Sequence, residues 1–290
     1  MEWRFYAVKR NLAIPAVLLA ALFWGTTGTS QSFAPEGASP LAFGAVRLAI
    51  GGLFLLSFSA ATGRLKLKGL PLPALLVSSA GMALYQPLFF SGVTQSGIAA
   101  GTVAALGSAP VIAGLLEWLL TARKPAVKWW IATAGAAGGC LLLFADKPSR
   151  GFQPAGLLLS VGAGAAFAVY ALFSKKLLER HSPETAAAAV FSLSALWLSP
   201  LLLFTDLSWL ITVRGTAVSL YIGIAATGVA YLLFNYGLSR LQASTTVTFS
   251  LAEPLAAAVL GILALGEPIS GWGIAGLLLM LGALLLLAGK

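Results

Sequence analysis

The sequence predicts an all-α polytopic membrane protein with ten transmembrane helices in two inverted five-helix repeats. Three observations carry this prediction. Only 9% of the 290 residues are charged and 59% are hydrophobic, whereas a soluble domain carries about 25% charged residues. The apolar residues form ten runs that are long enough to cross a bilayer. The lysines and arginines between these runs alternate between a rich side and a poor side.

The spans are placed by the need for about 20 apolar residues per crossing, or fewer where flanking side chains reach the interface. Short loops with prolines and glycines separate them. The first run is expected to be retained and not cleaved as a signal peptide, because nine more spans follow it. The predicted spans are 12–30, 41–61, 73–95, 98–121, 126–144, 153–178, 184–204, 213–237, 244–265 and 270–288.

The basic residues predict the orientation of the chain. Fourteen lysines and arginines fall on one side of the predicted spans and three, Lys147, Arg150 and Arg214, fall on the other. Positive loops stay in the cytoplasm, so both termini are predicted to be cytoplasmic. An even number of spans must then separate the termini, which supports ten independently of hydropathy. The net charge of +9 is explained by this orientation, and no nucleic-acid partner is expected.

The two halves, residues 1–150 and 151–290, resemble each other. A shift of 144 positions places Pro254 on Pro110 and Thr246 on Thr102. Near the start of each half, AALFWGTTG at 20–28 resembles AAFAVYALF at 165–173. Five spans are an odd number, so the halves must cross the membrane in opposite senses. Inverted repeats of this kind place the substrate near the midplane, between the repeats.

Four segments carry a resemblance to a known family. They are LFWGTT at 22–27, AVRLAIGG at 45–52, SAPVIAGLLEWLL at 108–120 and LAEPLAAAVLGILALGEPISGWGIAGLLLMLGALLLL at 251–287. With them the whole chain resembles the drug/metabolite transporter superfamily, and within it the EamA-type ten-helix exporters. The first half departs from the pattern, because Ala109 stands opposite Glu253 and Arg123 stands opposite Glu267.

Overall likeness also makes the chain similar to the YddG-type aromatic amino-acid exporters. This resemblance implies a monomeric transporter in the bacterial inner membrane that exports amino acids, aromatic ones in particular, without a cofactor. Its partners would be the small-molecule substrate and the lipid bilayer. Alternatives are a drug or nucleotide-sugar carrier of the same superfamily, and a membrane channel or structural subunit.

A zwitterion that crosses the bilayer must exchange its water for protein hydrogen bonds, and an aromatic side chain needs flat apolar walls. Polar and aromatic residues at mid-depth are therefore the binding candidates. Gln86 offers a donor and an acceptor, and Tyr231 and Asn235 share one helix face, although they could instead bond helix to helix. The candidate substrate-binding residues are Trp24, Thr27, Tyr85, Gln86, Phe89, Tyr170, Tyr231, Asn235, Ser244, Thr248 and Ser250.

Glu253 and Arg47 are ionisable residues inside predicted spans, which makes each a functional candidate. Glu253 is predicted either to couple transport to protons or to serve as a structural charge, and it could pair with Arg47. Arg47 is expected either to reach the outer interface or to hold the carbonyl groups of a neighbouring helix. Pro110 and Pro254 are expected to break their helices near the cavity.

Enzymatic and metal chemistry find no support in the sequence. The single histidine, His181, lies in a charged loop, and no phosphate-binding glycine loop is present. His, Cys and carboxylate residues show no metal-ligand spacing. Trp118, Trp129, Trp130 and Trp209 are expected to form interfacial aromatic belts.

Overall fold

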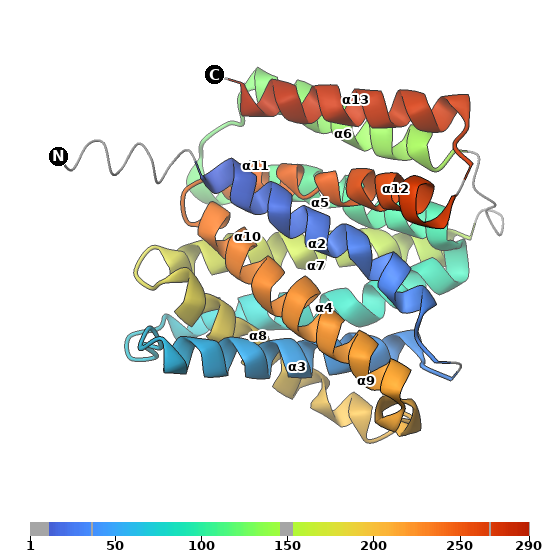
Figure 1. The fold of residues 1–290 in the computed structure, drawn as a ribbon. Helices are drawn as coiled ribbons and strands as arrows, with labels where there is room; N and C mark the ends of the chain where they lie inside the picture. Colours follow the sequence, from blue (N-terminus) through green and yellow to red (C-terminus); the bar gives the residue numbers. More distant parts are fainter. Residues whose placement is uncertain (1–11, 36, 146–152, 267, 290) are drawn as a thin grey trace.

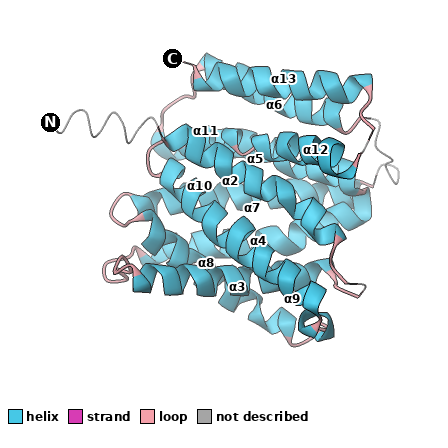
Figure 2. Ribbon diagram, in the orientation of Figure 1, coloured by secondary structure: helices cyan, strands magenta, loops and turns pink. Residues whose placement is uncertain are grey.

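The computed structural model describes residues 12–35, 37–145, 153–266 and 268–289, and helices are the only regular secondary structure in them (Figure 2). Arg4, Lys9, Arg10, Lys147, Arg150, Glu267 and Lys290 lie outside this part. The helices are α2 (Ala13–Ser32), α3 (Pro40–Ala61), α4 (Leu72–Ser96), α5 (Ile98–Thr121), α6 (Val127–Leu143), α7 (Pro154–Leu178), α8 (Pro183–Leu202), η1 (Ser208–Ile211), α9 (Val213–Leu220), η2 (Tyr221–Val229), α10 (Ala230–Leu238), α11 (Ala243–Phe249), α12 (Ala252–Leu265) and α13 (Gly271–Ala288).

The described helices make ten crossings of the bundle. Nine stretches are long and apolar enough to span a membrane, and α6 is a shorter apolar helix of 17 residues. One crossing is built from α9, η2 and α10, and another from α11 and α12. The predicted all-α fold class is therefore confirmed.

The loops divide between two ends of the bundle (Figure 1). The start of α2 and the end of α13 lie at the same end, as an even number of crossings requires. This end also carries the loops at 62–71, 122–126, 179–182 and 239–242, in which most of the described lysines and arginines gather. We call it the basic end and the other the opposite end.

The helix contacts follow the symmetry of an inverted repeat. The first helix of the first half, α2, packs on α12 and α10, and the first helix of the second half, α7, packs on α5 and α4. The second helices of the halves, α3 and α8, pack on each other, and so do the last helices, α6 and α13. Each contact between a helix of the first half and a helix of the second half thus recurs with the two halves exchanged.

Side-chain capping begins several of these helices. Ser39, Ser182 and Ser270 each accept a hydrogen bond from a backbone N–H three residues on, at 3.1–3.2 Å. Proline follows Ser39 and Ser182 at the first helical position, where its missing N–H costs nothing.

Close backbone approach holds α6 against α13. A Cβ atom on Gly139 would lie 2.7 Å from the Gly276 carbonyl oxygen, and one on Gly276 would lie 2.6 Å from the Gly139 carbonyl oxygen. In a membrane such small residues allow the packing contacts that replace hydrophobic association.

The two prolines that were expected to break their helices differ. The prediction for Pro110 is wrong, because α5 continues through it. The crossing that contains Pro254 is interrupted at Ser250 and Leu251, three to four residues before the proline. Here the N–H of Leu251 turns to the Thr248 carbonyl at 3.1 Å and the N–H of Glu253 to the Ser250 carbonyl at 2.9 Å. Pro254 has no N–H to continue the α-helical ladder across this turn.

Candidate functional site

Seven aromatic rings from five helices meet inside the bundle. The ring centroids of Trp24 and Tyr231 lie 4.8 Å apart, and those of Phe191 and Tyr231 lie 4.4 Å apart. Tyr85 joins through Phe167 at 5.7 Å. Tilted and edge-on ring pairs each stabilise a structure by about 0.5–1.5 kcal/mol beyond the area they bury. This aromatic cluster consists of Trp24, Tyr85, Phe167, Tyr170, Phe191, Tyr231 and Phe234.

Polar atoms at the cluster are buried without a hydrogen-bond partner. Among the described residues these include Trp24 Nε1, Thr27 Oγ1 and Asn235 Oδ1. The Asn235 amide nitrogen is satisfied, since Nδ2 donates to the Tyr170 hydroxyl at 3.2 Å and to the Tyr231 carbonyl at 2.9 Å. Leaving a buried polar group unpaired costs about 1–3 kcal/mol. The Trp24 N–H and the Asn235 amide oxygen are thus left unsatisfied beside the aromatic cluster.

Glu253 lies in the first turn of α12. Its charge acts on Arg47, Tyr85, Cys140 and Tyr231, which come from four other helices. Within the described part of the chain its carboxylate has no hydrogen-bond or ion-pair partner, and its side chain keeps partial exposure.

Arg47 does not pair with Glu253, since the ion pair found among the described residues joins Arg64 to Glu184. The Arg47 Nε donates to Thr227 Oγ1 at 3.1 Å, and a terminal nitrogen of Arg47 donates to the Ala226 carbonyl at 3.3 Å. Both partners belong to η2, a π-helical segment, and π-helical turns often occur at functional sites. Arg47 thus takes the second of its two expected positions, on the carbonyl groups of a neighbour.

Tyr85, Gln86 and Phe89 follow one another on α4 but face different neighbours. The Tyr85 ring stacks on Phe89 at 5.6 Å and belongs to the aromatic cluster. Gln86 is buried and lies against α3, where a Cβ on Gly44 would be 3.2 Å from its Oε1. The structure therefore separates Gln86 from the rings that it was expected to accompany.

The three candidates from α11 and its end lie apart from the cluster contacts. Thr248 Oγ1 accepts a hydrogen bond from Trp129 Nε1 at 3.1 Å and bonds the Thr133 hydroxyl at 3.1 Å, so it joins α11 to α6. Ser250 donates to the Val247 carbonyl at 2.7 Å within the helix break. Ser244 is buried at the start of α11.

Two tryptophans contradict the belt prediction. Trp129 is 4% exposed and Trp209 is 3% exposed. Trp209 donates from Nε1 to the Asp206 carbonyl at 3.1 Å. Internal hydrogen bonding replaces the interfacial role, because a buried indole N–H needs a protein partner.

Sequence reasoning missed several residues of the site. Phe167, Phe191 and Phe234 complete the aromatic cluster, but a search for polar tips passes over phenylalanine. Phe167 precedes Tyr170 by three residues and Phe234 follows Tyr231 by three, so helical spacing from the chosen tyrosines was the available signal. Among the described residues no group of three or more His, Cys, Asp or Glu side chains gathers that could hold a metal.

Both halves of the chain match a known protein family. The EamA-like transporter family model matches residues 11–145 and 154–289. A Bacillus subtilis protein named uncharacterized transporter YwfM is 49% identical over 284 residues, which cover 97% of this chain and 95% of that protein. The threonine/homoserine exporter RhtA of Escherichia coli K12 is 29% identical over 280 residues, covering 89% and 84% respectively.

A solved crystal structure that is 20% identical has a TM-score of 0.83 and covers 95% of this chain and 96% of the other. This likeness shows a shared fold. The resemblance to aromatic amino-acid exporters is not confirmed by these relatives. The two family matches, one in each half, show that the chain contains two repeats of the same kind. The chain belongs to the EamA-like transporter family of integral membrane transporters.

Proposed function

We propose that this transporter exports amino acids, with aromatic ones preferred, by alternating access through a site at the aromatic cluster. The observation that carries the proposal is the pair of unpartnered atoms Trp24 Nε1 and Asn235 Oδ1 beside the rings. An indole N–H can donate to a substrate carboxylate, and an amide oxygen can accept from a substrate ammonium group. The surrounding rings supply flat walls for an aromatic side chain.

Two opposite charges support recognition of a zwitterion. Glu253 carries a carboxylate without a protein partner, and the Arg47 guanidinium lies within its electrostatic reach. A substrate ammonium group would be attracted to Glu253, and the substrate carboxylate to Arg47. Fixed opposite charges in a low-dielectric interior interact more strongly than they would in water.

Orientation and mechanism complete the proposal. In this proposal the basic end faces the cytoplasm, as positive loops do, so both termini are cytoplasmic. The proposed location is the bacterial inner membrane. The chain works as a monomer in the lipid bilayer, and its two repeats rock about the site. Similarity to an exporter, RhtA, supports outward transport, and no catalytic step is part of the proposal.

A second candidate substrate class is the hydroxyl-bearing amino acids. RhtA exports threonine and homoserine according to its name. The buried Thr27 hydroxyl lacks a partner, and it could bond a substrate hydroxyl. The two classes differ in whether the rings or this hydroxyl select the side chain.

Reconstitution into liposomes tests both candidates. Labelled phenylalanine, tryptophan, threonine and homoserine would each be offered with and without a pH gradient. We expect saturable uptake that unlabelled aromatic amino acids inhibit. Inhibition by threonine and homoserine alone would replace the aromatic proposal with the second candidate. Flux that does not saturate would indicate a channel and contradict the carrier.

A further inference from the structure

Opposite charges hold the turn between α10 and α11 from two sides. The Glu117 carboxylate, on α5, accepts hydrogen bonds from the N–H groups of Ala243 at 3.0 Å and Ser244 at 2.9 Å. The Lys175 ammonium group, on α7, donates to the carbonyls of Leu238 at 2.6 Å and Leu241 at 2.8 Å. All four backbone partners lie within seven residues of the chain, so one turn carries the whole set.

These contacts satisfy groups that helix ends leave unpaired. The residue before α11, Gln242, makes no side-chain cap, and Glu117 supplies the missing acceptor from the other repeat. Lys175, which belongs to the same repeat as α10, donates to carbonyl groups at and just beyond the end of that helix. A carboxylate at a helix N-terminus and an ammonium group at a C-terminus are both favoured by the helix dipoles. Hydrogen bonds to charged groups are also about twice as strong as neutral ones.

Among the described residues, the repeat symmetry places no equivalent clamp at the opposite end. The shift of 144 positions places Glu117 on Gly261 and Lys175 on Gln31, and the residues next to these positions are uncharged too. The corresponding turn begins α5 at Gly97, without a side-chain cap. Nearer the opposite end, a neutral hydrogen bond of 2.8 Å between Thr26 and Tyr221 and the bonds of Arg47 to η2 join the repeats.

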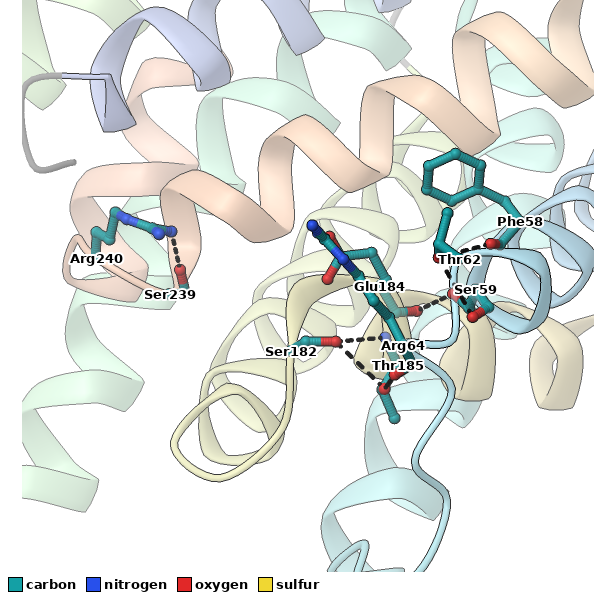
Figure 3. A network of polar contacts seen from close by, with 9 residues as sticks. All are labelled: Phe58, Ser59, Thr62, Arg64, Ser182, Glu184, Thr185, Ser239 and Arg240. Atoms are coloured by element: carbon teal, nitrogen blue, oxygen red, sulfur yellow. Dashed lines mark hydrogen bonds and ion pairs between the residues drawn. The ribbon is translucent and has the colours of Figure 1, made fainter.

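A further set of contacts joins the repeats at the basic end (Figure 3). Arg64, in the loop after α3, forms an ion pair with Glu184 in the first turn of α8. The Thr185 hydroxyl donates to the Arg64 carbonyl at 2.6 Å, and Ser59 donates to the Glu184 carbonyl at 3.0 Å. Glu117 and the Arg64–Glu184 pair thus make charged contacts between the repeats at the basic end.

We propose that Glu117 and Lys175 form a clamp that closes the basic end while the site faces the opposite end. They are positioning residues, because the clamped turn joins α10, which carries Tyr231 and Asn235, to the crossing that carries Glu253. Opening the basic end moves this turn away from α5 and breaks the Glu117 hydrogen bonds. The inference rests on the proposed alternating-access function and adds the residues that hold one of its two states.

Cysteine accessibility tests the clamp without a known substrate. Cys140→Ala removes the single native thiol, and two reporters are added in separate proteins. Val247→Cys probes the basic side, since Val247 is fully buried one turn beyond Ala243. Gly28→Cys probes the opposite side, since a Cβ there meets no atom within 4 Å. An exposed reporter, Lys68→Cys, first establishes which membrane face carries the basic end.

Each reporter is labelled with a membrane-impermeant maleimide in intact cells and in inside-out vesicles. With Glu117→Gln or Lys175→Met we expect labelling of Val247→Cys from the basic side to rise about tenfold, and labelling of Gly28→Cys from the opposite side to fall. The controls Glu179→Gln and Lys176→Met alter exposed residues at the end of α7, the helix of Lys175, and should change neither rate.

The paired readout separates a clamp from a merely structural contact. A structural role would raise labelling at Val247→Cys without lowering it at Gly28→Cys, and that result would overturn the proposal. Unchanged labelling at both reporters would overturn it as well. If Glu117→Gln fails to reach the membrane, Glu117→Asp keeps the charge, shortens its reach and is subject to the same two criteria. Labelling needs no substrate, so an incorrect substrate assignment leaves the result interpretable.

Discussion

The corresponding crossings α5 and α11–α12 each contain a proline, but only the second crossing is interrupted near it. Pro110 lies inside an unbroken helix and is preceded by Ala109, whereas Pro254 follows an interruption and is preceded by Glu253. The interruption gives α12 its own N-terminus inside the bundle, with Glu253 in the first turn. A helix N-terminus carries partial positive charge. The broken crossing therefore offers a carboxylate at its midpoint a favourable helix N-terminus, which the unbroken crossing lacks at Ala109.

The comparison teaches that the proline alone does not create the break. Both prolines lack an N–H, and only the second crossing turns its neighbouring amides to carbonyls three residues back. The break and the acid occur together in one half of the molecule. The asymmetry of the transporter is thus located in the crossing that faces α2, where the Glu253 carbonyl lies 3.0 Å from the position of a Cβ on Gly25.

The largest effect is expected from adding an acid to the unbroken crossing. Ala109→Glu places a carboxylate at a site that is 4% exposed, within a continuous helix whose N–H groups are already bonded. An uncompensated buried charge lowers the free energy of unfolding by about 3–5 kcal/mol. Thermal unfolding in detergent measures this loss, and Ala109→Gln controls for side-chain size. Equal stability of Ala109→Glu and the native chain would remove the comparison's physical basis.

The second-largest effect is expected from replacing Glu253, the carboxylate of the broken crossing. Glu253→Gln keeps the size of the side chain and removes its titration. If Glu253 couples transport to protons, uptake driven by a pH gradient should fall to its level without a gradient, while thermal stability changes by less than about 1 kcal/mol. Glu179→Gln, an exposed change, serves as the control. Undiminished pH-driven uptake by Glu253→Gln would leave Glu253 with a structural role.

A smaller effect is expected from the two prolines. Pro254→Ala restores an N–H and favours a continuous helix, which shifts Glu253 and should reduce the transport rate about tenfold or more. Pro110→Ala removes an unfavourable residue from a helix that is already continuous, so it should raise stability by up to about 3 kcal/mol and preserve transport. Parallel uptake and unfolding measurements compare them, and equal effects of the two substitutions would show that the crossings do not differ.

The sequence was sufficient for features that depend on composition and local spacing. Hydropathy and the basic loops predict ten crossings, and helical spacing predicts that Tyr231 and Asn235 share a face, where Asn235 indeed donates to the Tyr231 carbonyl. These features need no knowledge of how helices pack on one another. The prolines gave an incomplete prediction, since the same reasoning expected a break at Pro110, where α5 is continuous.

Features that depend on the packing between helices were beyond the sequence. In the sequence Trp129 resembles an interfacial belt residue, but in the structure its indole N–H donates to Thr248 on α11. Gln86 and Tyr85 are neighbours in the chain, yet α3 buries one and the aromatic cluster receives the other. Glu117 has an unremarkable position in α5 until the start of α11 meets it. Each depends on contacts between residues that are distant in the chain.

The apparent KM of the Trp24→Phe variant tests the central claim, that the unpartnered Trp24 N–H binds the substrate beside the aromatic cluster. The substitution keeps an aromatic ring and removes the donor. The account predicts that KM for phenylalanine rises about tenfold, the loss of one hydrogen bond to a charged group, while protein stability is retained. Trp197→Phe, at a tryptophan that is 52% exposed, should leave KM unchanged. An unaltered KM for Trp24→Phe in a folded protein would contradict the account.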